Sequence, residues 1–214
     1  MKCAPVCQFE REEAIWSNRE MVPEKLDRSF YARPAEELAP LLIGKILVRR
    51  LAAADGTSIT RRARIVETEA YVGQHDLACH AAKGRTGRTE IMFGPPGFAY
   101  VYLIYGMHDM LNIVASEVDD AQAVLIRGAT PLDDWQADLS GPGKLARALR
   151  ITRRDNGADL TGEELYLIDD HAPPTRIVRT PRIGVDYACE WKDKPLRFIV
   201  EERHRARKRR GRTG

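Results

Sequence analysis

Short apolar runs, many of them alternating with polar residues, recur along the middle of the chain. Two segments have the composition and end signals of helices: 35–43, which is followed by Gly44, and a segment that opens at 140–144 and extends to about Arg150. Most of the other runs follow one another with no helix between them, so the pattern predicts one α+β domain rich in antiparallel strands. Strands are expected at 46–51, 64–71, 98–104, 110–115, 123–127, 165–168 and 196–200.

The clearest turn signal lies between two of these strands, over 105–109. Apolar residues flank the segment Tyr-Gly-Met-His-Asp, which is typical of a protruding β-hairpin. Tyr105 and Met107 would then be poorly buried on its exposed turn. A wedge of this kind can enter a base stack and replace an extruded nucleotide. The alternatives are a tip that folds back onto the body and a contact with another protein.

Two carboxylates occur in a strand that otherwise suits a core. Alternation places Ile65, Glu67, Glu69 and Tyr71 on one face of the strand at 64–71. A carboxylate beside an aromatic ring can form a pocket in which Glu69 acts as a general base on water. The alternative is a solvated strand face.

Basic residues suited to phosphate lie in two places. The polar, Gly- and Pro-rich connection at 73–97 has the length of a functional or disordered loop, and its Lys83, Arg85 and Arg88 can hold phosphates or remain hydrated. The segment 140–144 lacks the spacing of a nucleotide-binding phosphate loop. A lysine at a helix amino terminus, here Lys144, can still hold a backbone phosphate.

The histidines, acidic residues and cysteines give little indication of a metal site. His75, Asp76, His80 and Glu67 carry suitable atoms, but their spacing fits no known metal-site pattern. The four cysteines show no C-x-x-C pair, so we expect reduced thiols and no metal site.

Composition and charge narrow the class of protein. The chain of 214 residues is 43% hydrophobic and 30% charged, as expected for a folded globular protein. No apolar run approaches the roughly 20 residues that span a bilayer, and no long apolar stretch follows Lys2, so we expect neither a membrane span nor a secretory signal. Basic residues and no acidic ones occupy 203–214. We expect a flexible tail there, which either attracts polyanions or only aids solubility.

Together these segments resemble the alkyladenine (3-methyladenine) DNA glycosylase family. The resemblance covers about residues 29–200 and rests on separated motifs in the same order. They are Arg64-Ile-Val-Glu-Thr-Glu-Ala-Tyr71, His80, Met92-Phe93, Tyr100-Val-Tyr-Leu-Ile-Tyr-Gly-Met107, Asn112, Arg127, Ser140-Gly-Pro-Gly-Lys-Leu145, Arg182-Ile-Gly-Val185, Glu190-Trp191 and Lys194-Pro-Leu-Arg-Phe198.

The resemblance implies roles for individual residues. Glu69 is expected to deprotonate the attacking water, which Arg127 and the backbone carbonyl of Ile183 hold. Asn112 is expected to crowd the exocyclic amine of guanine. Tyr105 is expected to intercalate, with Met107 beside it. The walls that stack on the flipped base are Tyr71, His80 and Tyr102. His108 stands where some relatives have an aromatic residue.

The resemblance also implies a fold, a reaction and partners. It predicts a curved antiparallel-rich sheet with flanking helices, in a glycosylase domain over 26–202 between an N-terminal extension (1–25) and the basic tail (203–214). The implied reaction is direct hydrolysis of the N-glycosidic bond, with no lysine Schiff base and no metal or organic cofactor. The substrate is double-stranded DNA containing damaged purines, and the enzyme is expected to be monomeric and cytoplasmic, nucleoid-associated in a bacterium or nuclear in a eukaryote. The alternatives are a nucleic-acid-binding module that does not cleave and a metal-dependent hydrolase.

Overall fold

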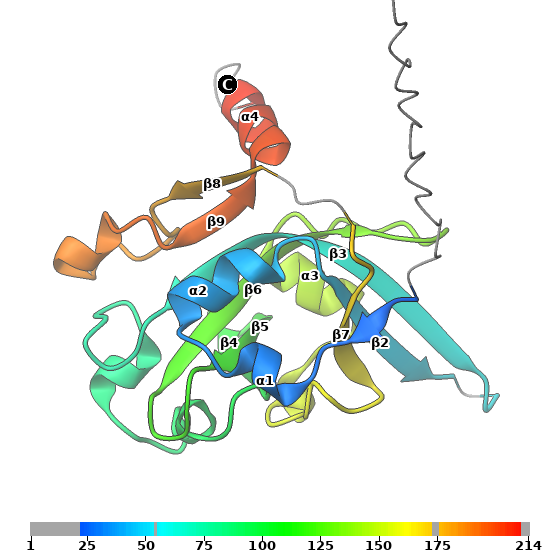
Figure 1. The fold of residues 1–214 in the computed structure, drawn as a ribbon, viewed down its shortest axis with the longest axis horizontal. Coiled ribbons are helices and arrows are strands. Elements are labelled where there is room, and N and C mark those ends of the chain that lie inside the picture. The colour runs from blue at the N-terminus through cyan, green and yellow to red at the C-terminus, as the bar shows by residue number, and fades with distance from the viewer. Residues whose placement is uncertain (1–21, 54, 173–175, 211–214) are drawn as a thin grey trace, which may run out of the picture.

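The long strand β3 (Ser58–Tyr71) lies at the centre of the β-sheet (Figure 1). The computed structural model describes residues 22–53, 55–172 and 176–210 of the chain. One edge of β3 pairs first with β2 (Ile46–Ala52) and then with β9 (Arg197–Val200), and the other edge pairs with β6 (Gln122–Pro131). β3 therefore brings strands from distant parts of the chain side by side.

The sheet continues on both sides of this centre. Beyond β6 it adds β5 (His108–Ala115) and β4 (Ala99–Ile104), and beyond β2 it adds β7 (Leu165–Asp169) and β1 (Glu24–Lys25). β8 (Ile177–Thr180) pairs with β9. The described residues thus form a nine-stranded sheet with antiparallel neighbours, which confirms the predicted single α+β domain.

The helices in the described part are short. They are α1 (Arg28–Tyr31), α2 (Ala35–Leu42), α3 (Pro142–Ala148) and α4 (Glu201–Arg210). α2 ends before Gly44, whose φ of +89° favours a residue without a Cβ, as the sequence predicted. α3 begins at a proline, which has no backbone N–H to leave unpaired in the first turn. None of the described helices is both long enough and apolar enough to cross a bilayer.

Alternation along β4, β5 and β6 sends successive side chains to different environments. One set joins α2 and α3 in the main hydrophobic core: Ala99 and Val101 of β4, Leu111 and Ile113 of β5, and Val124 and Ile126 of β6. The other set lines a cavity: Tyr100 and Tyr102, Met110 and Asn112, and Ala123, Leu125 and Arg127. The core face of the sheet therefore provides a rigid support for the residues of the cavity face.

Two β-bulges bend the pairing of β3 with β6 near the cavity. The register shifts between Ile65 and Glu67, which leaves Val66 extra on β3, and again between Glu67 and Thr68, which leaves Arg127 extra on β6. Bulges re-aim side chains and are common beside active sites. Strict alternation over 64–71 is wrong at this point, because Ile65 lies in the main core rather than on the face of Glu67.

Secondary structure extends into the predicted N-terminal extension and into the predicted tail. Two residues of the predicted N-terminal extension, Glu24–Lys25, form β1 against β7. The predicted flexible tail is helical as far as Arg210, since α4 continues directly from β9. An ion pair of 2.7 Å between Glu201 and Arg205, one turn apart, supports this helix, and acidic residues in its first turn suit the helix dipole. Residues 1–21 and 211–214 lie outside the described residues.

Candidate active site

A cavity of about 160 Å³ opens on the face of β4, β5 and β6 that lies opposite the main core. Two loops close it, one after β3 and one between β8 and β9. The predicted site residues that line it are Tyr71, His80, Tyr102, Tyr105, Asn112, Arg127 and Ile183, so the structure brings together residues more than 100 positions apart.

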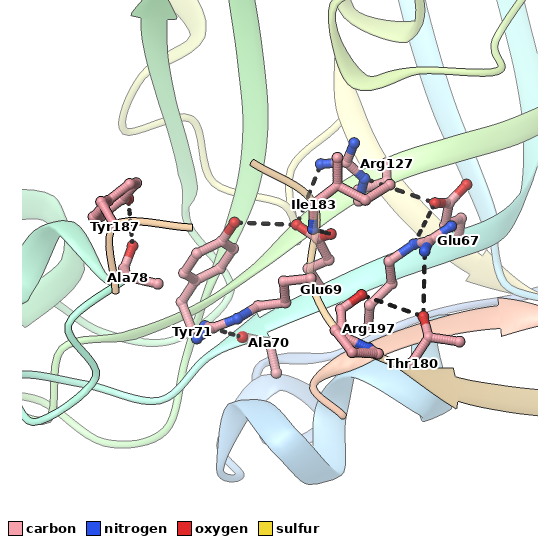
Figure 2. Close-up of polar contacts among 12 residues, drawn as sticks. Glu67, Glu69, Ala70, Tyr71, Ala78, Arg127, Thr180, Ile183, Tyr187 and Arg197 are labelled. Carbon is pink, nitrogen blue, oxygen red and sulfur yellow. Dashed lines mark hydrogen bonds and ion pairs between the residues drawn. The ribbon is translucent and has the colours of Figure 1, made fainter. Parts of the chain in front are cut away.

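The Glu69 carboxylate is fully buried and is hydrogen-bonded to three residues that line this cavity, two of them through their side chains (Figure 2). Its Oε1 accepts a hydrogen bond of 2.9 Å from the backbone N–H of Ile183. Its Oε2 accepts hydrogen bonds from the Tyr71 hydroxyl, at 3.1 Å, and from Nη1 of Arg127, at 3.2 Å. The three donors all line the cavity, so they hold the carboxylate at its edge.

Burial has the largest effect on the pKa of Glu69. The side chain is fully buried, and this burial raises the pKa of the carboxyl, while Arg127, the Ile183 N–H and the Tyr71 hydroxyl act in the opposite direction. A carboxylate that is less well solvated than usual is a stronger base. Its two oxygens offer about four lone-pair sites. The three hydrogen bonds use one of these sites on Oε1 and both on Oε2, so one lone-pair site on Oε1 is not occupied by these donors.

Aromatic rings form one wall of the cavity. The rings of His80 and Tyr102 meet edge to face, with centroids 4.5 Å apart, and Tyr100 lies 5.3 Å from Tyr102. His80 Nδ1 and the Tyr100 hydroxyl are 2.9 Å apart. Burial, together with Arg88 and Lys83, lowers the pKa of His80 to about 4. His80 is therefore neutral near pH 7.

A buried ion pair between Arg182 and Asp76 packs against the ring of Tyr71, which lines the cavity. The Arg182 guanidinium stands 4.8 Å from the centroid of the Tyr71 ring. It donates two hydrogen bonds to Asp76, of 2.5 and 2.8 Å, and one of 2.9 Å to the carbonyl of Ala70. Both charged side chains are fully buried. Because Ile183 follows Arg182, this pair also positions the backbone N–H that binds Glu69.

Asn112 is held by its own strand pair. The side chain is buried, and its amide donates to the carbonyls of Tyr100, at 3.1 Å, and Met110, at 3.4 Å. With the amide nitrogen engaged in this way, the Asn112 side chain forms a fixed part of the cavity wall.

The β4–β5 hairpin presents its tip to solvent. Tyr105 is 84% exposed and Met107 is 73% exposed, so the tip does not fold back onto the body. Tyr105 and Gly106 both have positive φ, at 51° and 67°, and form the centre of the turn. The turn is shorter than predicted, because His108 and Asp109 already belong to β5. Tyr105 also lines the cavity mouth.

The residues predicted to bind phosphates differ in their partners. Arg85 pairs with Glu90 and Asp119 and stacks on Phe93. Lys144 pairs with Asp138 at 2.7 Å. Arg88 stacks on Tyr102, with 5.0 Å between the guanidinium and the ring centroid, which places it beside the aromatic wall.

The residues of the metal-dependent alternative are engaged elsewhere. Asp76 is paired with Arg182, and Glu67 accepts a hydrogen bond of 2.8 Å from Nε of Arg197. The His75 ring packs edge to face on Trp191. Within the described ranges, no three His, Cys, Asp or Glu side chains are grouped closely enough to hold a metal ion.

Sequence reasoning did not assign several residues that shape the site. Tyr100 and Tyr187 line the cavity, and Arg182 and Arg197 bind carboxylates beside it. Alternation with Tyr102 could have pointed to Tyr100. Arg182 and Tyr187 lie on a loop with no periodic pattern, and the carboxylate partners of Arg182 and Arg197 are more than 100 residues away in the sequence.

Comparisons with known proteins agree with this geometry. A model of the Methylpurine-DNA glycosylase (MPG) family matches residues 29–204. A protein of Legionella pneumophila (strain Lens) is 46% identical over 179 residues, which cover 83% of this chain and 95% of that protein. A protein of Anaeromyxobacter sp. (strain Fw109-5) is 49% identical over 178 residues, 83% of this chain and 89% of that protein.

A protein of Myxococcus xanthus (strain DK1622) is 47% identical over 180 residues, 83% of this chain and 90% of that protein. All three bear the name "Putative 3-methyladenine DNA glycosylase". The range matched by the family model contains every residue that lines the cavity, from Tyr71 to Tyr187. The chain therefore belongs to the methylpurine-DNA glycosylase family.

Proposed function

We propose that this protein is a base-excision-repair DNA glycosylase that flips alkylated or deaminated purines out of duplex DNA and hydrolyses their N-glycosidic bond. The observation that carries the proposal is the position of Glu69, whose carboxylate is held by Tyr71, Arg127 and Ile183 at the edge of an aromatic cavity. The related proteins named above bear names of this activity.

The exposed hairpin tip suits the extrusion step. A base in a duplex hides its glycosidic bond, and flipping it out costs a few kcal/mol, less for a weakly paired lesion. An apolar or aromatic wedge fills the vacated space in the base stack. Tyr105 and Met107 are exposed, and Tyr105 stands at the cavity mouth, so the extruded base is close to its slot.

The cavity suits a damaged purine that is cationic. Tyr71, Tyr100 and Tyr102 line the cavity, and the face of an aromatic ring attracts a cation by about 0.5–2 kcal/mol. An N-alkylated purine cation leaves as a neutral base when its bond to the sugar breaks. With this leaving group, one base and one water suffice, and neutral His80 adds no acid.

The hydrolysis follows from the contacts of Glu69. A water at the remaining lone-pair site of the carboxylate loses a proton to Glu69, and its oxygen bonds to the anomeric carbon of the sugar. For an N-alkylated purine cation, the bond from that carbon to the base breaks, and the electrons of this bond neutralise the positive charge of the departing base. The products are the free base and an abasic site. Arg127 stabilises the carboxylate in its ionised form before the transfer.

The variant Glu69→Gln tests this function because it keeps the shape of the side chain and removes the base. We expect excision from methylated duplex to fall by about 10²–10⁴-fold, while binding of that duplex persists. Alkali cleavage of abasic sites measures excision, and Glu163→Gln, on an exposed carboxylate, is the matched control. Wild-type protein that binds damaged duplex without producing abasic sites would favour the binding module, and full activity in Glu69→Gln would exclude this role for Glu69.

We further expect the enzyme to act as a monomer in the cytoplasm.

A further inference from the structure

A second buried glutamate, Glu67, lies next to three arginines from three different elements. Nε of Arg197, on β9, donates to its Oε1 at 2.8 Å, and Nε of Arg127, on β6, lies 3.7 Å from the same oxygen. Nε of Arg203, on α4, lies 3.7 Å from Oε2. Glu67 is fully buried. The arrangement joins the core of the sheet to the C-terminal helix.

Arg127 connects this cluster to the proposed base (Figure 2). Its Nη1 donates to Oε2 of Glu69 at 3.2 Å, and its Nε faces Glu67 at 3.7 Å. A guanidinium is planar, and its donors are fixed relative to one another. Contacts with two carboxylates on different edges therefore set both the position and the tilt of the Arg127 plane.

A glycine makes room for the contact between α4 and Glu67. A Cβ built on Gly128 would lie 2.7 Å from Nη2 of Arg203 and 3.4 Å from Oε2 of Glu67. Gly128 does not have a positive φ, so its smallness rather than its backbone freedom is what matters. Arg203 is 20% exposed and also lies 3.5 Å from the carbonyl of Ala129.

We propose that Glu67 is a positioning residue for Arg127 and that Arg203 ties helix α4 to it, which makes the C-terminal helix part of the active-site scaffold. Arg203 balances part of the charge of Glu67. When Arg203 is removed, Glu67 attracts Arg127 more strongly, and Arg127 moves away from Glu69. The inference rests on the proposed glycosylase function, because the expected consequence of losing Arg203 is slower hydrolysis of the N-glycosidic bond.

Two variants of the same helix test the role of Arg203. Arg203→Gln removes one positive charge that reaches Glu67, and Arg205→Gln removes one that pairs with Glu201 in solvent. With enzyme in excess over damaged duplex and at saturation, we expect excision by Arg203→Gln to be about 10-fold slower than by Arg205→Gln. A decrease in rate that both variants show is the effect of removing one positive charge from the helix. Equal excision rates for the two variants would overturn the proposal.

Gly128→Ala tests the same contact without changing any charge. Its new methyl group displaces the end of the flexible Arg203 side chain, so we expect a loss of about 10-fold in the wild-type background. In the Arg203→Gln background the methyl group has room, and we expect less than about a 2-fold further loss. Losses that multiply in the double variant would show independent sites and overturn the proposal.

The pH profile separates positioning from simple stability. When Arg127 moves away from Glu69, the ionised form of Glu69 loses support, although the Tyr71 hydroxyl, the Ile183 N–H and Arg197 still face it. We expect the acidic limb of the rate to move to higher pH in Arg203→Gln and to stay in place in Arg205→Gln. A lowered Tm with an unmoved limb would overturn the proposal. Wild-type protein that excises no base would overturn the glycosylase function itself.

Discussion

Tyr71 has two functions in the site, one for each part of its side chain. Its ring lines the cavity on one side and meets the Arg182 guanidinium, 4.8 Å from its centroid. Its hydroxyl donates to Glu69 at 3.1 Å. A hydrogen bond to a carboxylate stabilises the ionised form and lowers the pKa of the acid. We therefore propose that Tyr71 contributes to base binding through its ring and limits how strongly Glu69 holds a proton through its hydroxyl.

Tyr71→Phe separates these two contributions. The ring remains, while the pKa of Glu69, already raised by burial, rises further because one donor to its ionised form is lost. The general base must be ionised, so activity falls as the pH drops through the pKa of Glu69. We expect the acidic limb of single-turnover excision to move to higher pH, with affinity for damaged duplex changed by less than about 2-fold. A limb that stays at the wild-type pH would show that the hydroxyl does not support Glu69.

At the scale of elements, the β4–β5 hairpin combines exposure with backbone strain. Tyr105 has a φ of 51°, in the left-handed region that a bulky residue enters at a cost of about 1–3 kcal/mol. Asparagine adopts this region more readily. A strained, exposed aromatic residue at the cavity mouth lowers stability, which is expected where the side chain has a function.

Tyr105→Asn should therefore make the protein more stable and less active. We expect a gain of about 1 kcal/mol, or about 2–4 °C in Tm, from relief of strain. We also expect slower excision, because the wedge is lost, with unchanged affinity for undamaged duplex. His171→Asn, at an exposed residue with a φ of 52°, is the control that changes the backbone preference far from the cavity. Equal losses of affinity for damaged and undamaged duplex would contradict the wedge role.

The elements that the sequence predicted correctly are those with a local signal. Alternation, apolar runs and turn residues were enough to place β2, β4, β5, β7 and β9, parts of β3 and β6, and the hairpin tip, and Gly44 marked the end of α2. The bulges at Val66 and Arg127 have no such signal, because they depend on how β3 pairs with two partners. The sequence predicted a flexible basic tail where α4 forms. It gave no sign of the helix, because the helix is supported by the ion pair of Arg205 with Glu201 and by the contact of Arg203 with the distant Glu67.

The sequence predicted the site residues that lie in recognisable motifs, but it did not predict which other residues hold them in place. The resemblance assigned roles to seven of the residues that line the cavity, and the structure places these seven together. It did not supply the partners that fix them, such as Asp76 for Arg182 or Arg197 for Glu67. These pairs join positions more than 100 residues apart, and no periodicity connects such positions before the chain is folded.

At the scale of the whole molecule, the pair of Asp76 and Arg182 connects the loop after β3 to the loop after β8. Besides Asp76, Arg182 donates to the carbonyls of Ala70, at 2.9 Å, and Trp191, at 3.4 Å. A buried ion pair often adds little net stability, because the desolvation of both charges offsets their attraction. Its value here lies in specifying one arrangement of the two loops that close the cavity.

This interpretation predicts different effects on stability and on activity. Asp76→Asn leaves the Arg182 charge buried without a counter-charge, and we expect a loss of about 3–5 kcal/mol in urea unfolding. The double variant Asp76→Asn/Arg182→Met removes both charges, so we expect it to be more stable than Asp76→Asn alone. It should still excise damaged bases about 10-fold or more slowly than wild type, because the Ile183 N–H and the Tyr71 ring are no longer held in place. A double variant that excises at the wild-type rate would show that the loops find this arrangement without the ion pair.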